Sequence, residues 1–127
     1  NIKFNFNSNK PANFYFDYDQ INRVCFNLIK NSIESLKEKS KKTSNFNKNI
    51  NIEIIKHIDY ISLTIKDTGI GFKNIKISEL TKPYFTTKDD GTGLGLSIVS
   101  KIINDHNGAI TFTNLNDGAK VEIKFYK

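Results

Sequence analysis

Two glycine clusters bracket the stretch of the chain that most restricts how it can fold. The first, DTGIG, begins with Asp67, and the second, GTGLGLSIV, covers residues 91–99 and leads into an apolar helical pattern. Glycines let a backbone adopt positive φ and come close to a ligand, and the first amides of a helix are unpaired donors with partial positive charge. Residues 67–99 are therefore suited to binding a polyphosphate.

The composition predicts a single folded domain over residues 1–127. A chain of 127 residues can form one core, and its ten Phe and five Tyr favour a packed interior over disorder. The formal net charge of +6 comes mostly from scattered lysines. The one basic run, KEKSKK at residues 37–42, is typical of a solvated helix end, so we expect no nucleic acid partner.

Cysteine content and hydropathy predict a cytoplasmic domain without membrane contact. The single cysteine, Cys25, excludes an internal disulfide and lies in an apolar run, which indicates a buried, inert thiol. No stretch reaches the roughly 18 to 20 apolar residues of a spanning helix, and no signal peptide is visible. The start without Met indicates a fragment of something longer.

Hydrophobic periodicity predicts the secondary structure. Alternating patterns predict strands at 2–6, 14–18, 51–57, 60–66, 109–113 and 120–126. Helical periods predict a helix from Ile21 to about Lys39, capped by Asp17 or Asp19, and a second helix over residues 94–107 that stops at Asn107-Gly108.

The segments between these elements are expected to be loops. Residues 40–49 are polar and aperiodic, and Asn116-Asp117-Gly118 is the turn of the last hairpin. Residues 72–92 are weakly patterned, with a short possible helical turn at 75–80, and a loop this long inside a small domain is typical of an active-site lid. The element order predicts an α/β two-layer sandwich, a mixed, largely antiparallel sheet covered on one face by helices.

The first predicted helix carries a polar stripe. Asn27, Lys30, Asn31 and Glu34 are spaced by three, four and seven residues, which places them on the side opposite the apolar stripe. A solvated face explains this pattern as well as a site does. Mg²⁺, however, takes few protein oxygens besides water and substrate phosphates, so one Asn oxygen facing a phosphate-binding loop would suffice.

Asp67 has two readings of its own. A carboxylate at the end of a strand can accept a hydrogen bond from an exocyclic amine such as that of adenine, but Asp is also favoured at the first position of a turn such as DTG. Neither glycine cluster is a GxxxxGK[ST] loop, and the second lacks the βαβ context of a dinucleotide site.

Four segments in order resemble the motifs of the ATP-binding catalytic domain of bacterial sensor histidine kinases, a branch of the GHKL superfamily that includes gyrase and the heat-shock chaperone and mismatch-repair ATPases. Residues 19–34 resemble the N box, 67–72 the first glycine box, 82–88 (KPYFTTK) the F box and 91–99 the second glycine box. The last two are most similar to the nitrogen-regulation type. The resemblance covers residues 13–126 and implies a Bergerat-type fold.

The resemblance implies roles for individual residues. Asn31 would ligate Mg²⁺ with Asn27 in support, Asp67 would bond the adenine amino group, and Gly69 and Gly71 would let the backbone pass the base. The phosphates would contact the lid and the second glycine box, and Lys30 of the first helix is a further candidate. The lid and the glycine box would contribute Thr87, Lys88, Gly91, Thr92, Gly93 and Gly95. Apolar walls would come from Ile70, Leu94, Leu96 and Ile98.

Two positions depart from relatives in the superfamily. Hydrolysing relatives have a Glu general base four residues before the metal Asn, where this chain has Asn27, an amide that takes no proton. We therefore expect very slow intrinsic ATP hydrolysis. Many sensor kinases carry a Lys where this chain has Glu34, which leaves Lys30 or Lys88 to neutralise the γ-phosphate.

The resemblance implies a kinase that acts on a partner domain. Neither His57 nor His106 lies in the motif of a phosphoacceptor, and no dimerising heptads are visible, so a monomer is expected that donates to a His on a separate dimerisation hairpin and, through it, to a response regulator. Alternatives are a non-catalytic nucleotide-binding regulatory module and a serine kinase of the anti-sigma type on the same fold.

Overall fold

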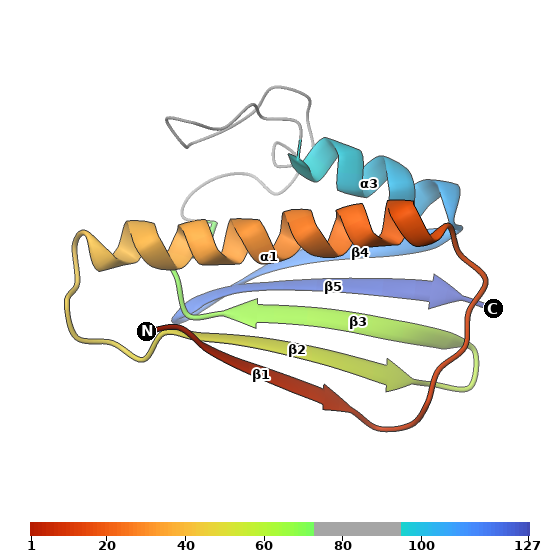
Figure 1. Cartoon of the computed structure of the whole chain (residues 1–127), viewed down its shortest axis with the longest axis horizontal. Helices are drawn as coiled ribbons and strands as arrows, with labels where there is room; N and C mark the ends of the chain where they lie inside the picture. The colour runs from red at the N-terminus through yellow and green to blue at the C-terminus, as the bar shows by residue number, and fades with distance from the viewer. Residues whose placement is uncertain (73–94) are drawn as a thin grey trace.

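The computed structural model describes residues 1–72 and 95–127, and in these residues the chain forms two layers, a sheet and a pair of helices (Figure 1). The elements are β1 (Lys3–Ser8), α1 (Tyr18–Ser40), β2 (Asn49–Lys56), β3 (Tyr60–Asp67), α3 (Gly95–Asp105), β4 (Gly108–Leu115) and β5 (Gly118–Tyr126).

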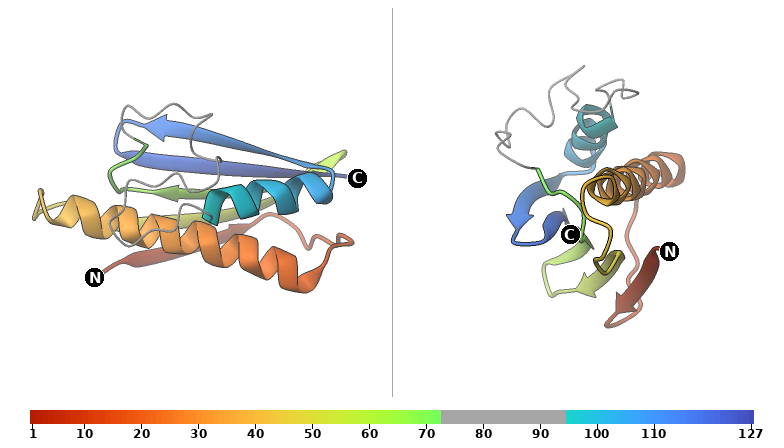
Figure 2. Two further views of the ribbon diagram at one scale, coloured as in Figure 1. Left: turned by 90° about the horizontal axis from the view of Figure 1, so that it is seen from above. Right: turned by 90° about the vertical axis from the view of Figure 1, so that its left-hand side faces the viewer.

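Within the described residues the strands form one five-stranded sheet in the order β1-β2-β3-β5-β4. β1 runs parallel to β2, and the other neighbouring pairs are antiparallel. Both helices lie on the same face of the sheet and run antiparallel to each other (Figure 2). The prediction of a mixed, largely antiparallel sheet with helices on one face is confirmed.

The core lies between the sheet and the helices. From α1 the buried apolar residues are Val24, Leu28 and Leu36, as the predicted apolar stripe requires. From α3 they are Val99, Ile102 and Ile103. The strands alternate, so that every second residue faces the helices; Ile50, Leu63, Ile65, Ile123 and Phe125 complete this cluster.

The predicted strand at residues 14–18 is wrong. α1 begins at Tyr18 because the side chain of Asp17 accepts a hydrogen bond from the Gln20 amide, which makes Asp17 and not Asp19 the N-cap. Phe14 packs against Phe125, but both Tyr15 and Phe16 are exposed, so the FYF pattern does not mark one buried side. The segment instead connects the sheet layer to the helix layer (Figure 1), and it is not one of the paired strands of the sheet.

The end of α3 is built as the sequence predicts. Asn107 adopts a φ of 56° directly before Gly108, which is the left-handed conformation that ends helices. His106 ties this end to the start of α1: its Nε2 accepts a hydrogen bond of 3.1 Å from the Asp17 amide, and its Nδ1 lies 2.8 Å from the Ile102 carbonyl oxygen. The two helices are therefore linked at this end of the sheet.

The predicted lid, its possible helical turn at 75–80 and the F box at 82–88 fall on residues 73–94, outside the described part of the chain. In the described residues, neither helix combines the length and apolar character needed to span a bilayer. Cys25 is half-buried against the core, and burial raises the pKa of its thiol, which keeps it protonated.

Candidate functional site

The carboxylate of Asp67 is the centre of the candidate site. It ends β3, and strand alternation turns it toward the helices while its neighbour Lys66 points to the opposite face. Its side chain is 7 % exposed. It accepts hydrogen bonds from the Gly69 amide at 2.9 Å, from the Ala119 amide and from the hydroxyl of Ser32 on α1.

Burial raises the pKa of Asp67, while the Gly69 amide, the Ser32 hydroxyl, the Ala119 amide and the charge of Lys39 oppose that rise. A carboxylate offers about four acceptor sites. Among the described residues three donors reach the carboxylate, which leaves one acceptor site there for a further N–H donor. The Gly69 contact also closes the local turn that the DTG sequence favours. The role of Asp67 in this turn is therefore compatible with its expected role as an acceptor for adenine.

The turn that follows Asp67 is fastened to α1. The Ile70 amide donates to Ser35 Oγ at 2.9 Å, and Lys39 Nζ donates to the Thr68 carbonyl oxygen at 2.9 Å. A Cβ on Gly69 would collide with Ser35, so glycine is needed there for the turn to approach the helix. α1 therefore fixes the position of the turn.

The far side of the turn rests on the β4–β5 hairpin. Gly71 adopts a φ of 72°, and the Phe72 amide donates to Asn114 Oδ1 at 2.6 Å. Gly118, with a φ of 128°, lies directly against the Asp67 backbone carbonyl. Asp67 is thus held from both sides, by a helix and by a hairpin.

The polar stripe of α1 lies beside this turn. Asn27, Asn31 and Glu34 are half-buried, whereas Lys30 is exposed. Asn31 directly precedes Ser32, the helix residue that bonds Asp67. Amide and carboxylate oxygens are ligands that Mg²⁺ accepts, so the donor set fits this ion. Within residues 1–72 and 95–127 no group of three or more His, Cys, Asp or Glu forms a competing metal site.

The start of α3 carries the described part of the second glycine box. Among the described residues, a Cβ on Gly95 would meet nothing within 4 Å. Leu96 is half-buried and packs against the core, as does Ile98. Ile70 is also half-buried. The remaining predicted site residues lie outside the described part of the chain; they are Thr87, Lys88, Gly91, Thr92, Gly93 and Leu94.

Sequence reasoning missed Ser32, Ser35 and Lys39, which connect α1 to the turn. Ser32 carried a signal: it lies four residues from both Leu28 and Leu36, on the buried face of the helix, and is 5 % exposed. A buried hydroxyl needs a hydrogen-bond partner, which here is Asp67. Nothing in the sequence pointed to the contact from Ala119.

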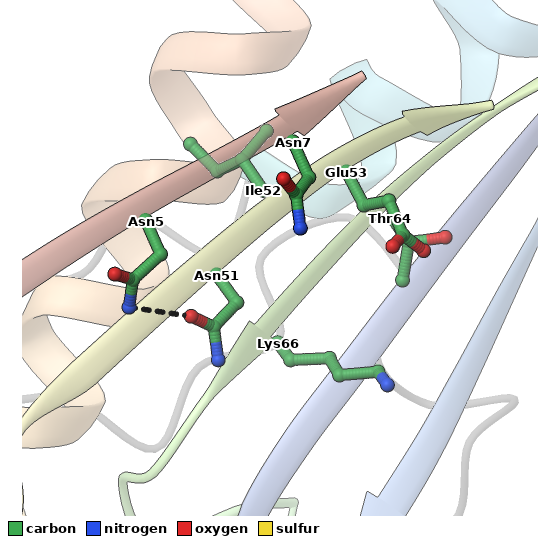
Figure 3. Close-up of a pocket in the computed structure, with 7 residues that line it drawn as sticks. All are labelled: Asn5, Asn7, Asn51, Ile52, Glu53, Thr64 and Lys66. Atoms are coloured by element: carbon green, nitrogen blue, oxygen red, sulfur yellow. Dashed lines mark hydrogen bonds between the residues drawn. The ribbon is translucent and has the colours of Figure 1, made fainter. Parts of the chain in front are cut away.

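Two hollows lie elsewhere. One, of about 230 Å³, lies on the sheet face that points away from the helices (Figure 3) and is lined by Asn5, Asn7, Asn51, Ile52, Glu53, Thr64 and Lys66. There Asn5 Nδ2 donates to Asn51 Oδ1 at 2.7 Å. The other, of about 530 Å³, lies where Phe14 and His106 meet Tyr126. Neither is lined by a predicted site residue.

Solved structures share this arrangement. The catalytic domain of the histidine kinase ThkA superposes with a TM-score of 0.82 at 30% identity, and the match covers 99% of this chain and 79% of that one. The mycobacterial sensor histidine kinase MprB has the same fold, with a TM-score of 0.78 at 20% identity, over 98% of this chain and 81% of that one.

Sequence relatives have the same character. An NtrY-like sensor histidine kinase from Rickettsia felis is 36% identical over 127 residues, which cover 98% of this chain and 20% of the relative. Sporulation kinase E from Bacillus subtilis is 35% identical over 96 residues, 76% of this chain and 12% of the relative. The chain thus spans about a fifth or less of these relatives.

The model of the histidine kinase-, DNA gyrase B- and HSP90-like ATPases matches residues 16–127, which include every described contact around Asp67. The resemblance read from the four motifs is therefore confirmed. The chain belongs to this ATPase family and, within it, to the catalytic domains of sensor histidine kinases.

Proposed function

We propose that this domain binds Mg²⁺-ATP and donates the γ-phosphoryl group to a histidine on a separate dimerisation and phosphoacceptor domain of a two-component sensor kinase. The observation that carries the proposal is the buried Asp67 carboxylate, to which the described residues supply three donors, so that one acceptor site is left for an N–H such as the 6-amino group of adenine. Gly69 and Gly71 would let the backbone of the turn pass the base.

Asn31 and Asn27 would hold the phosphate end of the nucleotide. Asn31 supplies an oxygen for Mg²⁺, and the ion when bound neutralises charge on the phosphates. The amides at the start of α3, from Gly95 and Leu96, and the second glycine box would face the phosphates. Because Asn27 takes no proton, it activates no water, and the γ-phosphoryl is kept for transfer. Lys30 or Lys88 would complete the neutralisation.

The acceptor histidine lies on another domain in this proposal, since both histidines of this chain already serve the fold. His106 joins α3 to the start of α1, and His57 stacks on Tyr60 with ring centroids 4.1 Å apart. We propose that residues 1–127 form one cytoplasmic, monomeric domain whose partners are the histidine hairpin and, downstream, a response regulator.

The test is a transfer assay. The chain, radiolabelled Mg²⁺-ATP and the histidine hairpin of an NtrY-like relative are mixed, and we expect acid-labile phosphate on the hairpin and almost no turnover without it. Binding without any transfer would instead favour a non-catalytic regulatory module. Acid-stable phosphoserine on a partner would favour the anti-sigma type of kinase. A folded chain that binds no nucleotide would overturn the proposal.

The raised pKa of Asp67 gives the proposal a pH dependence. Burial shifts the pKa of this carboxyl above its ordinary value, and the ionised form is the stronger acceptor for the amine. The affinity for the nucleotide is therefore greatest at neutral pH and falls as the pH drops toward the raised pKa, at a higher pH than for an exposed Asp. Titrations with adenosine remove the ionisation of a phosphate near pH 6 from the measurement. An affinity that stays constant down to pH 4 would contradict this pH dependence.

A further inference from the structure

Three polar side chains of α1 contact consecutive parts of the turn after β3. Ser32, Ser35 and Lys39 are spaced by three and four residues and so lie on one side of the helix. They bond the Asp67 carboxylate, the Ile70 amide and the Thr68 carbonyl oxygen, respectively. Such a row of contacts is more than helix packing requires, because it fixes both the backbone of the turn and the direction of one side chain.

We propose that Ser32 is a positioning residue that aims the Asp67 carboxylate at the nucleobase and thereby sets the preference for adenine over other purines. This inference rests on the proposed function, because it deepens the same site. Ser32 itself stays out of contact with the nucleotide in this arrangement and acts through Asp67.

The need for an aiming residue follows from the freedom of a carboxylate. The last torsion of an Asp side chain is broad, so burial alone leaves the direction of the open acceptor site undefined. The Gly69 and Ala119 amides approach from the turn and from β5. The Ser32 hydroxyl adds a donor from the helix layer, and donors from three directions hold the plane of the carboxylate.

Ser35 and Lys39 keep the direction of the Asp67 carboxylate constant, because they hold the backbone of the turn that follows Asp67. Lys39 is itself fixed, since its Nζ lies 4.6 Å from the centroid of the Phe46 ring as well as 2.9 Å from the Thr68 carbonyl oxygen. Because Asn31 and Ser32 are adjacent on the same rigid helix, the metal end and the base end of the site keep a constant separation.

A fixed acceptor distinguishes purines by the group at position 6. Adenine presents an amine there, which donates to the carboxylate, whereas hypoxanthine presents an oxygen, which is repelled by it. A site built to bond one N–H rejects an analogue that lacks it strongly, and we expect the wild-type chain to prefer ADP over IDP by about a hundredfold. If the Asp67 carboxylate lost its fixed direction, the ratio of the ADP affinity to the IDP affinity would fall.

The experiment compares ADP and IDP binding by calorimetry, with Mg²⁺ present, in the 127-residue wild type, Ser32→Ala and Ser40→Ala. Ser40 is the matched control, because in the described part of the chain its hydroxyl donates to the Leu36 carbonyl oxygen of the same helix, at 2.9 Å. We expect Ser32→Ala to weaken ADP about tenfold and IDP less than twofold, since it loses one hydrogen bond to a charged group. Ser40→Ala should leave both affinities unchanged.

The ratio of the ADP affinity to the IDP affinity distinguishes a misdirected Asp67 carboxylate from a loss of folded protein. A partly unfolded variant would bind less of both nucleotides in equal proportion, whereas a misdirected carboxylate changes the ratio. An unchanged ratio in Ser32→Ala, with the wild type preferring ADP, would overturn the role of Ser32 and leave the proposed function standing. A wild type that binds neither nucleotide would overturn both.

Discussion

Asp67→Asn is expected to weaken binding of ADP with Mg²⁺ by at least about thirtyfold, or about 2 kcal/mol. The substitution keeps the size of the side chain but replaces one acceptor oxygen by an NH₂ group. Around Asp67, the Gly69 and Ala119 amides and the Ser32 hydroxyl all donate. The new amide must therefore either face one of these donors or turn its own donor toward the adenine amine. Calorimetric titration measures the loss.

Asp59→Asn is the matched control for this experiment. It removes the same charge from an exposed position in the β2–β3 turn, at the opposite end of β3 from Asp67. Its ADP affinity should equal that of the wild type. If Asp67→Asn bound ADP as tightly as Asp59→Asn does, the adenine pocket would have to lie elsewhere and the assignment of Asp67 would be wrong.

Most of the fold could be predicted because its helices and strands follow local hydrophobic periodicity. The helical stripe through Val24, Leu28 and Leu36 and the alternation in β3 and β5 each reflect a buried face. The strand expected at residues 14–18 failed because an alternating pattern does not by itself supply a neighbouring strand. Phe14 is half-buried against Phe125, Phe16 is exposed, and the segment is not one of the paired strands of the described sheet.

The part of the candidate site that lies within one sequence motif could be predicted. The contacts between segments that are far apart in the sequence could not. Asp67 and the glycines of its turn stand together in the sequence. The contacts from Ser32 and Ala119 join α1, β3 and β5, and such a meeting depends on sheet order and register rather than on any local pattern. The approach of Gly69 to Ser35 likewise joins two segments far apart in the sequence.

Gly118→Ala is expected to be the most destabilising single substitution near the site, at about 3 kcal/mol or more of the free energy of unfolding. Gly118 has a φ of 128°, which strains any residue with a Cβ. That Cβ would also run into the backbone carbonyl of Asp67, which the β3–β5 pairing holds in place. Relief would require β5 to shift away from β3, and chemical denaturation measures the cost.

Gly95→Ala supplies the contrast, because among the described residues a Cβ at Gly95 meets nothing within 4 Å, and the residue starts α3. Alanine favours helix over glycine by about 1 kcal/mol, so this variant should be at least as stable as the wild type. The pair separates glycines needed for the fold from those free to serve a ligand. Since Gly118 supports Asp67, any folded Gly118→Ala should also bind ADP more weakly. If Gly118→Ala and Gly95→Ala were equally stable, the contact between β3 and β5 at Gly118 would be less close than the backbone geometry indicates.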